Sequence, residues 1–149
     1  LSNETNTVIG MDYSIGMVEK FNSKAKELGF TNISAIQHNI NEQELPQNEF
    51  DLIAISMTLH HIKDTEMFIK KAKSSLKNGG HLCINDLVKE DGTFHDEHKN
   101  EGVEHFGYDK EELCNLIKNN GFEIIEYKIV YTDHRNNKDY PIFQIIAKS

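Results

Sequence analysis

A short apolar run that ends on an acidic residue constrains the fold more than any other stretch. The run covers Val8 to Met11 and ends on Asp12. Ser14 then opens an amphipathic segment that reaches Gly29. This pattern predicts a parallel β-strand followed by a helix. In open α/β sheets ligands bind outside the carboxyl ends of strands, so Asp12 is placed to accept hydrogen bonds from ribose hydroxyls. The alternative is that Asp12 caps the helix beside Ser14, since both residue types favour that position.

The rest of the chain continues to alternate between apolar runs and amphipathic segments. Predicted strands cover residues 7–11, 32–37, 50–55, 81–85, 122–131 and 140–147, and predicted helices cover 14–28, 65–77 and 109–120. Residues 50–55 are almost continuously apolar, which is typical of a central parallel strand buried on both faces. The pattern predicts an α/β fold with a mostly parallel sheet flanked by helices and an antiparallel hairpin at the C-terminal end. We expect one domain across residues 1–149.

Composition narrows the kinds of partner. The 149 residues carry a net charge of −8, and nucleic-acid binding needs clustered Lys and Arg, so we expect no nucleic-acid partner. Cys83 and Cys114 lie inside apolar patterns, which predicts buried free thiols in a reducing compartment. No apolar run has the length of a membrane span and no signal peptide is evident. We therefore expect a cytoplasmic protein with no membrane partner.

Five short motifs follow one another in an order that is informative as a set. They are DYSIGM at 12–17, HNI at 38–40, FDLI at 50–53 leading to LHHIKD at 59–64, LKNGG at 76–80, and NGF at 120–122. Together they resemble the class I S-adenosylmethionine-dependent methyltransferases across nearly the whole chain. The resemblance implies a Rossmann-like fold and S-adenosylmethionine as the cofactor.

By this resemblance the cofactor-binding residues would be Asp12, Tyr13, Met17, Asn39, Ile40, Ser56 and Met57. Asp12 would bind the ribose, while Tyr13 and Met17 would flank the adenine. Asn39 and Ile40 would hold the adenine edge. Ser56 and Met57 would border the methionyl and sulfonium region. The two methionines have plainer alternatives, since Met17 would equally suit the core face of its helix and Met57 would equally fill space.

Two departures from the family pattern are visible. The family's first strand and its glycine-rich loop are absent, so we expect a gap in the sheet, or a different closure, and further residues upstream of Leu1. The second departure is Asn39, which stands where the family usually has Asp. The side-chain oxygen of Asn39 can still accept a hydrogen bond from the adenine amino group.

His60 and His61 are the catalytic candidates, because they follow the buried strand at the ligand end of the sheet. A histidine that titrates near neutrality can remove a proton from a nucleophile during methyl transfer. In the alternative, one histidine packs beneath the next helix and the other caps it.

The segment that follows the fourth predicted strand is also rich in histidine. His95, His98 and His105 match no zinc-binding spacing, so we expect a solvated loop and no metal. Phe94, His105, Phe106 and Tyr108 would instead suit a lid over the acceptor.

The resulting hypothesis is S-adenosylmethionine-dependent methyl transfer to a small-molecule acceptor. Two alternatives stay open: a nicotinamide-dependent oxidoreductase, because an acid at a strand end also binds ribose in dinucleotide folds, and a non-catalytic nucleotide-binding relative. The sequence indicates neither the acceptor nor the oligomeric state.

Overall fold

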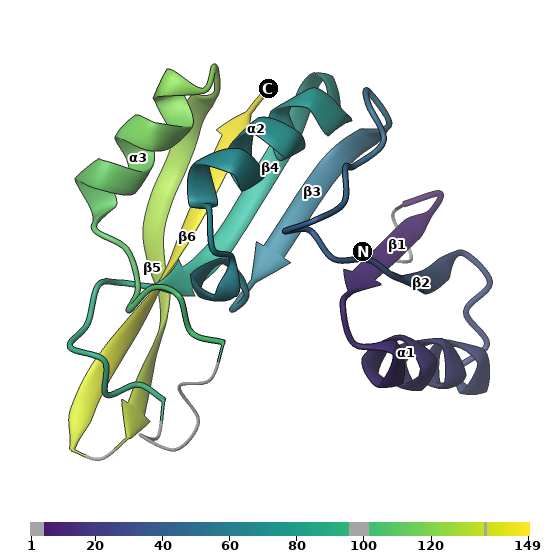
Figure 1. Cartoon of the computed structure of the whole chain (residues 1–149), viewed down its shortest axis with the longest axis horizontal. Helices are drawn as coiled ribbons and strands as arrows, with labels where there is room; N and C mark the ends of the chain where they lie inside the picture. Colours follow the sequence, from purple (N-terminus) through teal and green to yellow (C-terminus); the bar gives the residue numbers. More distant parts are fainter. Residues whose placement is uncertain (1–4, 96–101, 136) are drawn as a thin grey trace. The chain divides into compact units, whose positions relative to one another are not determined.

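The computed structural model describes residues 5–95, 102–135 and 137–149, and it divides into two compact units (Figure 1). The first unit is Leu1–Gln43 and the second is Glu44–Ser149. The expectation of a single domain stays a prediction. No helix among the described residues is long and apolar enough to cross a membrane.

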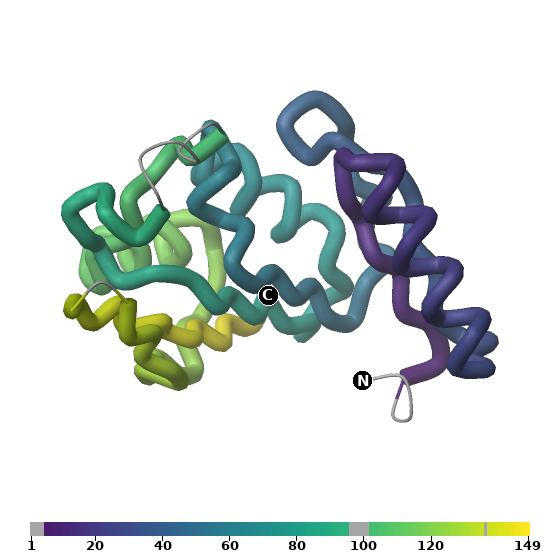
Figure 2. The backbone as a smooth tube through the Cα atoms, turned by 90° about the horizontal axis from the view of Figure 1, so that it is seen from below, coloured from purple at the N-terminus to yellow at the C-terminus, as the bar shows by residue number. Residues whose placement is uncertain are grey.

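The first unit is a β-α-β arrangement. Strand β1 (Val8–Asp12) pairs in parallel with β2 (Ile33–Gln37), and helix α1 (Ile15–Glu27) connects them. The helix runs alongside the two strands (Figure 2) and buries Val18 and Ala25. Ser14 occupies the N-cap position as expected, but its side chain makes no capping hydrogen bond.

One polar side chain attaches α1 to the sheet. The amide of Asn22 donates to the carbonyl oxygen of Ala35 (2.9 Å), and its oxygen accepts from the Ala35 amide (2.7 Å). The backbone amide and carbonyl of Ala35, on the edge of β2 away from β1, are thereby both satisfied by one side chain.

The second unit contains a mixed four-stranded sheet in the order β3-β4-β6-β5. Its strands are β3 (Phe50–Ser56), β4 (Leu76–Leu87), β5 (Glu123–Arg135) and β6 (Lys138–Lys148). β3 and β4 are parallel, whereas β6 is antiparallel to both β4 and β5. Helices α2 (Thr65–Ser75) and α3 (Lys110–Asn119) lie on this sheet (Figure 1). A short 3₁₀ helix, η1 (Leu59–His61), follows β3. The predicted α/β class and antiparallel C-terminal hairpin are confirmed.

The core of the second unit lies between the sheet and its helices. Alternate residues of β4 and β6 face inward because side chains alternate along a strand. The fully buried apolar residues are Leu59, Ile69, Ala72, Leu82, Ile84, Ile117, Ile145 and Ala147. Cys114 is buried and Cys83 is half-buried, and both are free thiols, as expected.

Two predictions about the strands are wrong in detail. Residues 50–55 were expected to form a central strand, but β3 has one partner and lies at the edge of its sheet, with Leu52 41% exposed. β4 begins at Leu76 rather than at residue 81. The pairing of β4 with β3 jumps from Leu76 to His81, so Gly79 and Gly80 lie in an irregular part of the strand.

The last two strands are longer than predicted. The charged residues 132–139 were expected to form a connection, yet β5 continues to Arg135, β6 begins at Lys138, and the two strands pair as a hairpin. A hairpin that extends into solvent does not need apolar side chains, and cross-strand polar pairs stabilise it. The His134 Nδ1–Asp139 Oδ1 pair (2.6 Å) is one of these.

The strands do not form one continuous sheet, in keeping with the gap expected where the family's first strand is absent. β1 and β2 make a two-stranded sheet of their own, and β3 to β6 make the other.

Asp109→Ala should lower the free energy of unfolding by about 1 kcal/mol, because Asp109 Oδ1 accepts from the amides of Glu111 (2.8 Å) and Glu112 (3.0 Å) at the start of α3. Urea denaturation measures the change. Asn115→Ala, at an exposed position in the middle of the same helix, is the control and should change stability by no more than about 0.5 kcal/mol. Equal effects of the two substitutions would contradict the capping role.

Candidate functional site

Asp12 lies at the carboxyl end of β1, where the sequence places it. Its Oδ1 accepts a hydrogen bond from the Ser14 amide (2.8 Å), which fixes the turn into α1. Among the described residues, Oδ2 has no partner, and the side chain is only partly buried. One oxygen of Asp12 therefore stabilises the start of α1, as the capping alternative proposed in part. The other carboxylate oxygen can still accept a hydrogen bond from a ligand hydroxyl.

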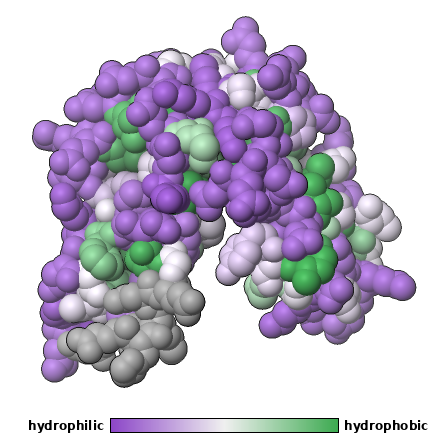
Figure 3. Space-filling model, viewed as in Figure 1, coloured by the Kyte–Doolittle hydropathy of each residue, from purple (hydrophilic) through white to green (hydrophobic). Residues whose placement is uncertain are grey.

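The two side chains predicted to flank an adenine are exposed. Tyr13 is 76% exposed and Met17 is 53% exposed, and apolar groups of this kind reach the surface at several places (Figure 3). The alternative in which Met17 packs in the core is therefore wrong. A purine ring could be covered by these side chains without any rearrangement of the unit's own core.

Asn39 and Ile40 follow β2, at the same end of the two-stranded sheet as Asp12. The Asn39 amide donates to Gln43 Oε1 (2.7 Å), and its side-chain oxygen accepts from the Asn41 amide (3.1 Å). A carbonyl oxygen has two lone pairs, so Asn39 Oδ1 retains capacity for one more donor. The adenine role of these residues stays a prediction.

Ser56 is the last residue of β3, and Met57 follows it. Ser56 is exposed, and its carbonyl oxygen accepts from Thr58 Oγ1 (2.9 Å). Met57 has a positive φ of 49°, an uncommon conformation for a residue with a side chain. Met57 also packs against the buried cluster of Leu87, Phe94 and Tyr140. This packing supports the alternative in which Met57 fills space, and the cofactor role of both residues stays a prediction.

His60 is buried and hydrogen-bonded to an aspartate. Its side chain is 1% exposed, and its Nδ1 lies 2.7 Å from Oδ1 of Asp86, which is fully buried at the end of β4. Asp86 also accepts from the backbone amides of His60 (3.3 Å) and Leu87 (2.7 Å). A carboxylate can only accept, so the His60 Nδ1 carries the proton of this hydrogen bond. His60 is thus buried against Asp86 of β4. The part of the alternative in which the other histidine caps the next helix is wrong, because Asp64 is the N-cap of α2.

His61 and His95 lie beside His60 and are more exposed. The His60 and His61 ring centroids are 4.1 Å apart, and His95 Nε2 lies 3.2 Å from His60 Nε2. His61 Nδ1 lies 2.7 Å from the carbonyl oxygen of Gly102, so this nitrogen is also the protonated one. The pKa of His95 is lowered mainly by partial burial and secondly by the nearby His60 and His61. The lowered pKa favours the neutral form of His95.

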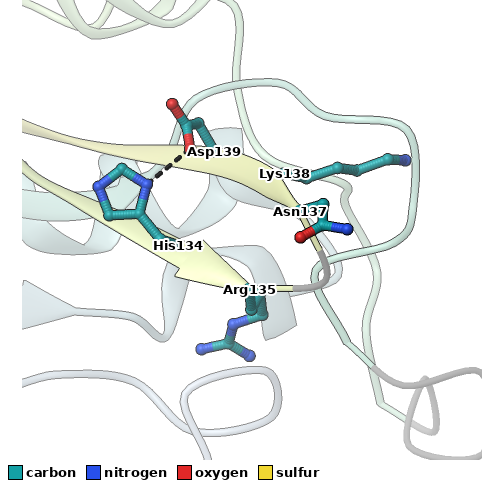
Figure 4. A pocket seen from close by; sticks show the side chains of 5 residues that line it. All are labelled: His134, Arg135, Asn137, Lys138 and Asp139. Atoms are coloured by element: carbon teal, nitrogen blue, oxygen red, sulfur yellow. Dashed lines mark hydrogen bonds and ion pairs between the residues drawn. The ribbon is translucent and has the colours of Figure 1, made fainter.

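The C-terminal hairpin positions His95. Phe94 is buried against Tyr140 of β6, with the two rings in an edge-to-face arrangement. The guanidinium of Arg135 lies over the Phe94 ring (4.1 Å) and donates to the Phe94 carbonyl oxygen (3.2 Å). Figure 4 shows Arg135 with the other residues that line a surface hollow at the hairpin tip. This hollow contains none of the predicted site residues.

The segment around residues 102–108 is attached to η1 by several hydrogen bonds. The amides of Glu104 and His105 donate to the His60 carbonyl oxygen (2.9 and 3.1 Å). The Tyr108 hydroxyl donates to the Leu59 carbonyl oxygen (2.9 Å), and burial raises the pKa of this tyrosine. Phe106 is exposed, and its ring lies where a side chain at position 92 would otherwise reach, which suits the glycine there. The lid role stays a prediction, and His98 lies outside the described residues.

Comparison with known proteins identifies the family. A model of the methyltransferase domain family matches residues 1–145. The chain belongs to this family. The uncharacterized methyltransferase C1347.09 of Schizosaccharomyces pombe is 33% identical over 125 residues, which cover 75% of this chain and 44% of that protein. Demethylmenaquinone methyltransferase of Listeria welshimeri is 33% identical over 78 residues, which cover 52% of this chain and 33% of that protein. The chain thus spans less than half the length of these two relatives.

Solved structures agree with the fold. Phosphoethanolamine N-methyltransferase 2 of Haemonchus contortus, in complex with S-adenosyl-L-methionine, gives a TM-score of 0.77 at 16% identity and covers 96% of this chain and 43% of that one. An S-adenosylmethionine-dependent methyltransferase of Mesorhizobium loti gives 0.70 at 18% identity, over 97% of this chain and 81% of that one. Family and fold confirm the class I methyltransferase resemblance, and the cofactor of the family is S-adenosylmethionine.

Two residues of the histidine site were missed by the sequence analysis. Asp86 follows an apolar strand in the same way as Asp12, so an acid at a strand end was an available signal. His95 gave no usable signal, because 35 residues separate it from His60.

Asp86→Ala should lower the free energy of unfolding by about 3 kcal/mol, because it leaves the Nδ1–H of His60 and the amide of Leu87 buried without an acceptor. Chemical denaturation of the variant and the parent gives the difference. The control is Asp51→Ala on the neighbouring strand, where an exposed ion pair with Lys77 is lost and less than about 1 kcal/mol is expected. A loss at Asp86 no larger than at Asp51 would show that the buried pair does not stabilise the unit.

Proposed function

We propose that the protein transfers a methyl group from S-adenosylmethionine to a small-molecule acceptor. The observation that carries this proposal is the open carboxylate oxygen of Asp12 at the end of β1, in a chain that belongs to a methyltransferase family. The relatives named above are methyltransferases, so the nicotinamide-dependent alternative is not favoured.

The first unit supplies the residues that fit the adenosine part of the cofactor. The free oxygen of Asp12 suits a ribose hydroxyl, and the exposed faces of Tyr13 and Met17 suit the apolar faces of a purine. The spare lone pair of Asn39 Oδ1 suits the adenine amino group. None of these groups has to leave a buried position to meet the ligand.

The second unit supplies the acceptor-side chemistry. When bound, S-adenosylmethionine provides an activated methyl group on a sulfonium, so the protein mainly has to orient the acceptor and manage its proton. The acceptor loses a proton if its nucleophile is a neutral hydroxyl, thiol or amine. His60 and His61 are proposed to act at this step, with His61 the more accessible of the two.

Asp12→Ala should weaken the binding of S-adenosylhomocysteine by about 1.5–3 kcal/mol, the scale of a hydrogen bond to a charged group. Calorimetric titration of the full-length protein measures the affinity. Glu19→Ala removes an exposed acid from α1 and should leave the affinity unchanged. An unchanged affinity in Asp12→Ala would refute the ribose role, and binding of NAD in place of S-adenosylhomocysteine by the parent protein would refute the proposed reaction.

His61→Ala should reduce turnover roughly 100-fold, within the range for loss of a group that manages a proton, while cofactor affinity stays nearly the same. Turnover is followed as S-adenosylhomocysteine release with the member of a panel of phenols, thiols and amines that supports it. His134→Ala removes an exposed histidine of the C-terminal hairpin and serves as the control. Wild-type turnover in His61→Ala would exclude an acceptor-side role for this residue.

A further inference from the structure

Three imidazoles from two separate segments meet in the second unit. His60 and His61 belong to η1, and His95 follows the Phe94 side chain that the hairpin holds. One ring nitrogen from each residue lies within 4.8 Å of one ring nitrogen of the other two. Such a cluster concentrates electron-pair donors, and the described ring nitrogens make one direct contact with each other, between His60 Nε2 and His95 Nε2 (3.2 Å).

In two of these rings the nitrogen that would not face the metal already donates to an oxygen, as metal-binding histidines usually do. His60 donates its Nδ1–H to the buried carboxylate of Asp86 (2.7 Å), and His61 donates its Nδ1–H to the carbonyl oxygen of Gly102 (2.7 Å). A partner of this kind fixes the tautomer and the ring orientation, and it leaves Nε2 as the donor atom. The carboxylate also makes the His60 imidazole a stronger ligand.

We propose that His60, His61 and His95 bind a divalent transition-metal ion of the zinc class. Nitrogen donors of the imidazole type suit Zn²⁺ and Co²⁺, and three protein ligands with one open position are typical of a catalytic zinc site. His60 closes the inner side of the site, whereas His61 and His95 are partly exposed and give the ion a route in.

The distances are close to those of a tetrahedral site. Zn–N bonds of 2.0–2.1 Å place two ligand nitrogens about 3.4 Å apart. The His60 Nε2–His95 Nε2 distance of 3.2 Å is already near this value. The wider separations, up to 4.8 Å, must shorten, so binding should draw the partly exposed rings inward while the buried His60 stays in place.

The sequence pattern predicted no metal and grouped His95 only with His98 and His105. The structure separates His105 from this group, since its Nε2 lies 3.0 Å from the Ile62 carbonyl oxygen and near Thr65 Oγ1. Among the residues that the structure describes, His60, His61 and His95 are the one group of metal-binding side chains with this proximity.

The site goes beyond the proposed methyl transfer and does not require it. If both hold, an ion with an open position would bind the acceptor's oxygen or sulfur and make its proton easier to lose to solvent. The histidines would then act through the ion. Metal binding and S-adenosylhomocysteine binding are measured separately, so failure of one proposal leaves the other standing.

The test is metal binding by the full-length, tag-free protein after treatment with a chelator. Titration calorimetry with Zn²⁺ should give one ion per chain, and Co²⁺ should give the strong visible absorption of a tetrahedral nitrogen site. His95→Ala and His61→Ala should each weaken metal binding by at least about 100-fold, more than the loss of a residue that only hydrogen-bonds to a ligand. Asp86→Asn, which keeps the side-chain shape, should weaken it by about 10- to 100-fold.

His134→Ala is the matched control, because His134 is exposed and paired only with Asp139 on the hairpin. It should retain one tightly bound ion. The proposal is overturned if the parent protein binds Zn²⁺ no more tightly than His95→Ala, or if His134→Ala loses the ion as His95→Ala does. The His60–His95 contact would then be a hydrogen bond between two imidazoles and nothing more.

Discussion

The buried pair of Asp86 and His60 is the interaction on which the second unit's candidate site depends. A fully buried carboxylate is costly unless its lone pairs are used, and Asp86 uses them on a ring nitrogen and two backbone amides. These bonds attach η1 to the end of β4. Because η1 is a single turn that could not persist alone, the pair also sets where His61 lies and where the His60 carbonyl oxygen receives the 104–105 backbone.

Asp12 and Asp86 show how one sequence feature leads to two different outcomes. Each follows an apolar strand, and each accepts from a nearby backbone amide. Asp86 ends a strand that has partners on both sides, so the surrounding chain buries it and a histidine satisfies it. Asp12 ends a strand of the two-stranded sheet and stays partly exposed. Burial therefore makes one acid a structural anchor and leaves the other available to a ligand.

Much of the fold was predictable because hydrophobic periodicity is a local property. The β-α-β start, the helices at 65–77 and 109–120, and the antiparallel ending were all foreseen. The predictions were wrong where pairing with neighbouring strands decides the position or the length of a strand. The apolar run of β3 looked central but lies at a sheet edge, and residues 132–135 and 138–139 belong to β5 and β6 because cross-strand pairing stabilises them. The site was foreseen only in part: Asp12, His60 and His61 stand at strand ends, whereas the contact with His95 depends on the hairpin.

The sequence by itself determined the family, the order of strands and helices, and the acid at the end of β1. These follow from residue types at short spacing, which the local backbone converts directly into strands, turns and helices. Only the tertiary structure decided that Met17 is exposed, that Met57 packs against a buried cluster, and that His60 is buried on Asp86 with His95 beside it. Contacts between residues 26 and 35 positions apart depend on how strands pair and how the hairpin folds back, and no local pattern encodes them.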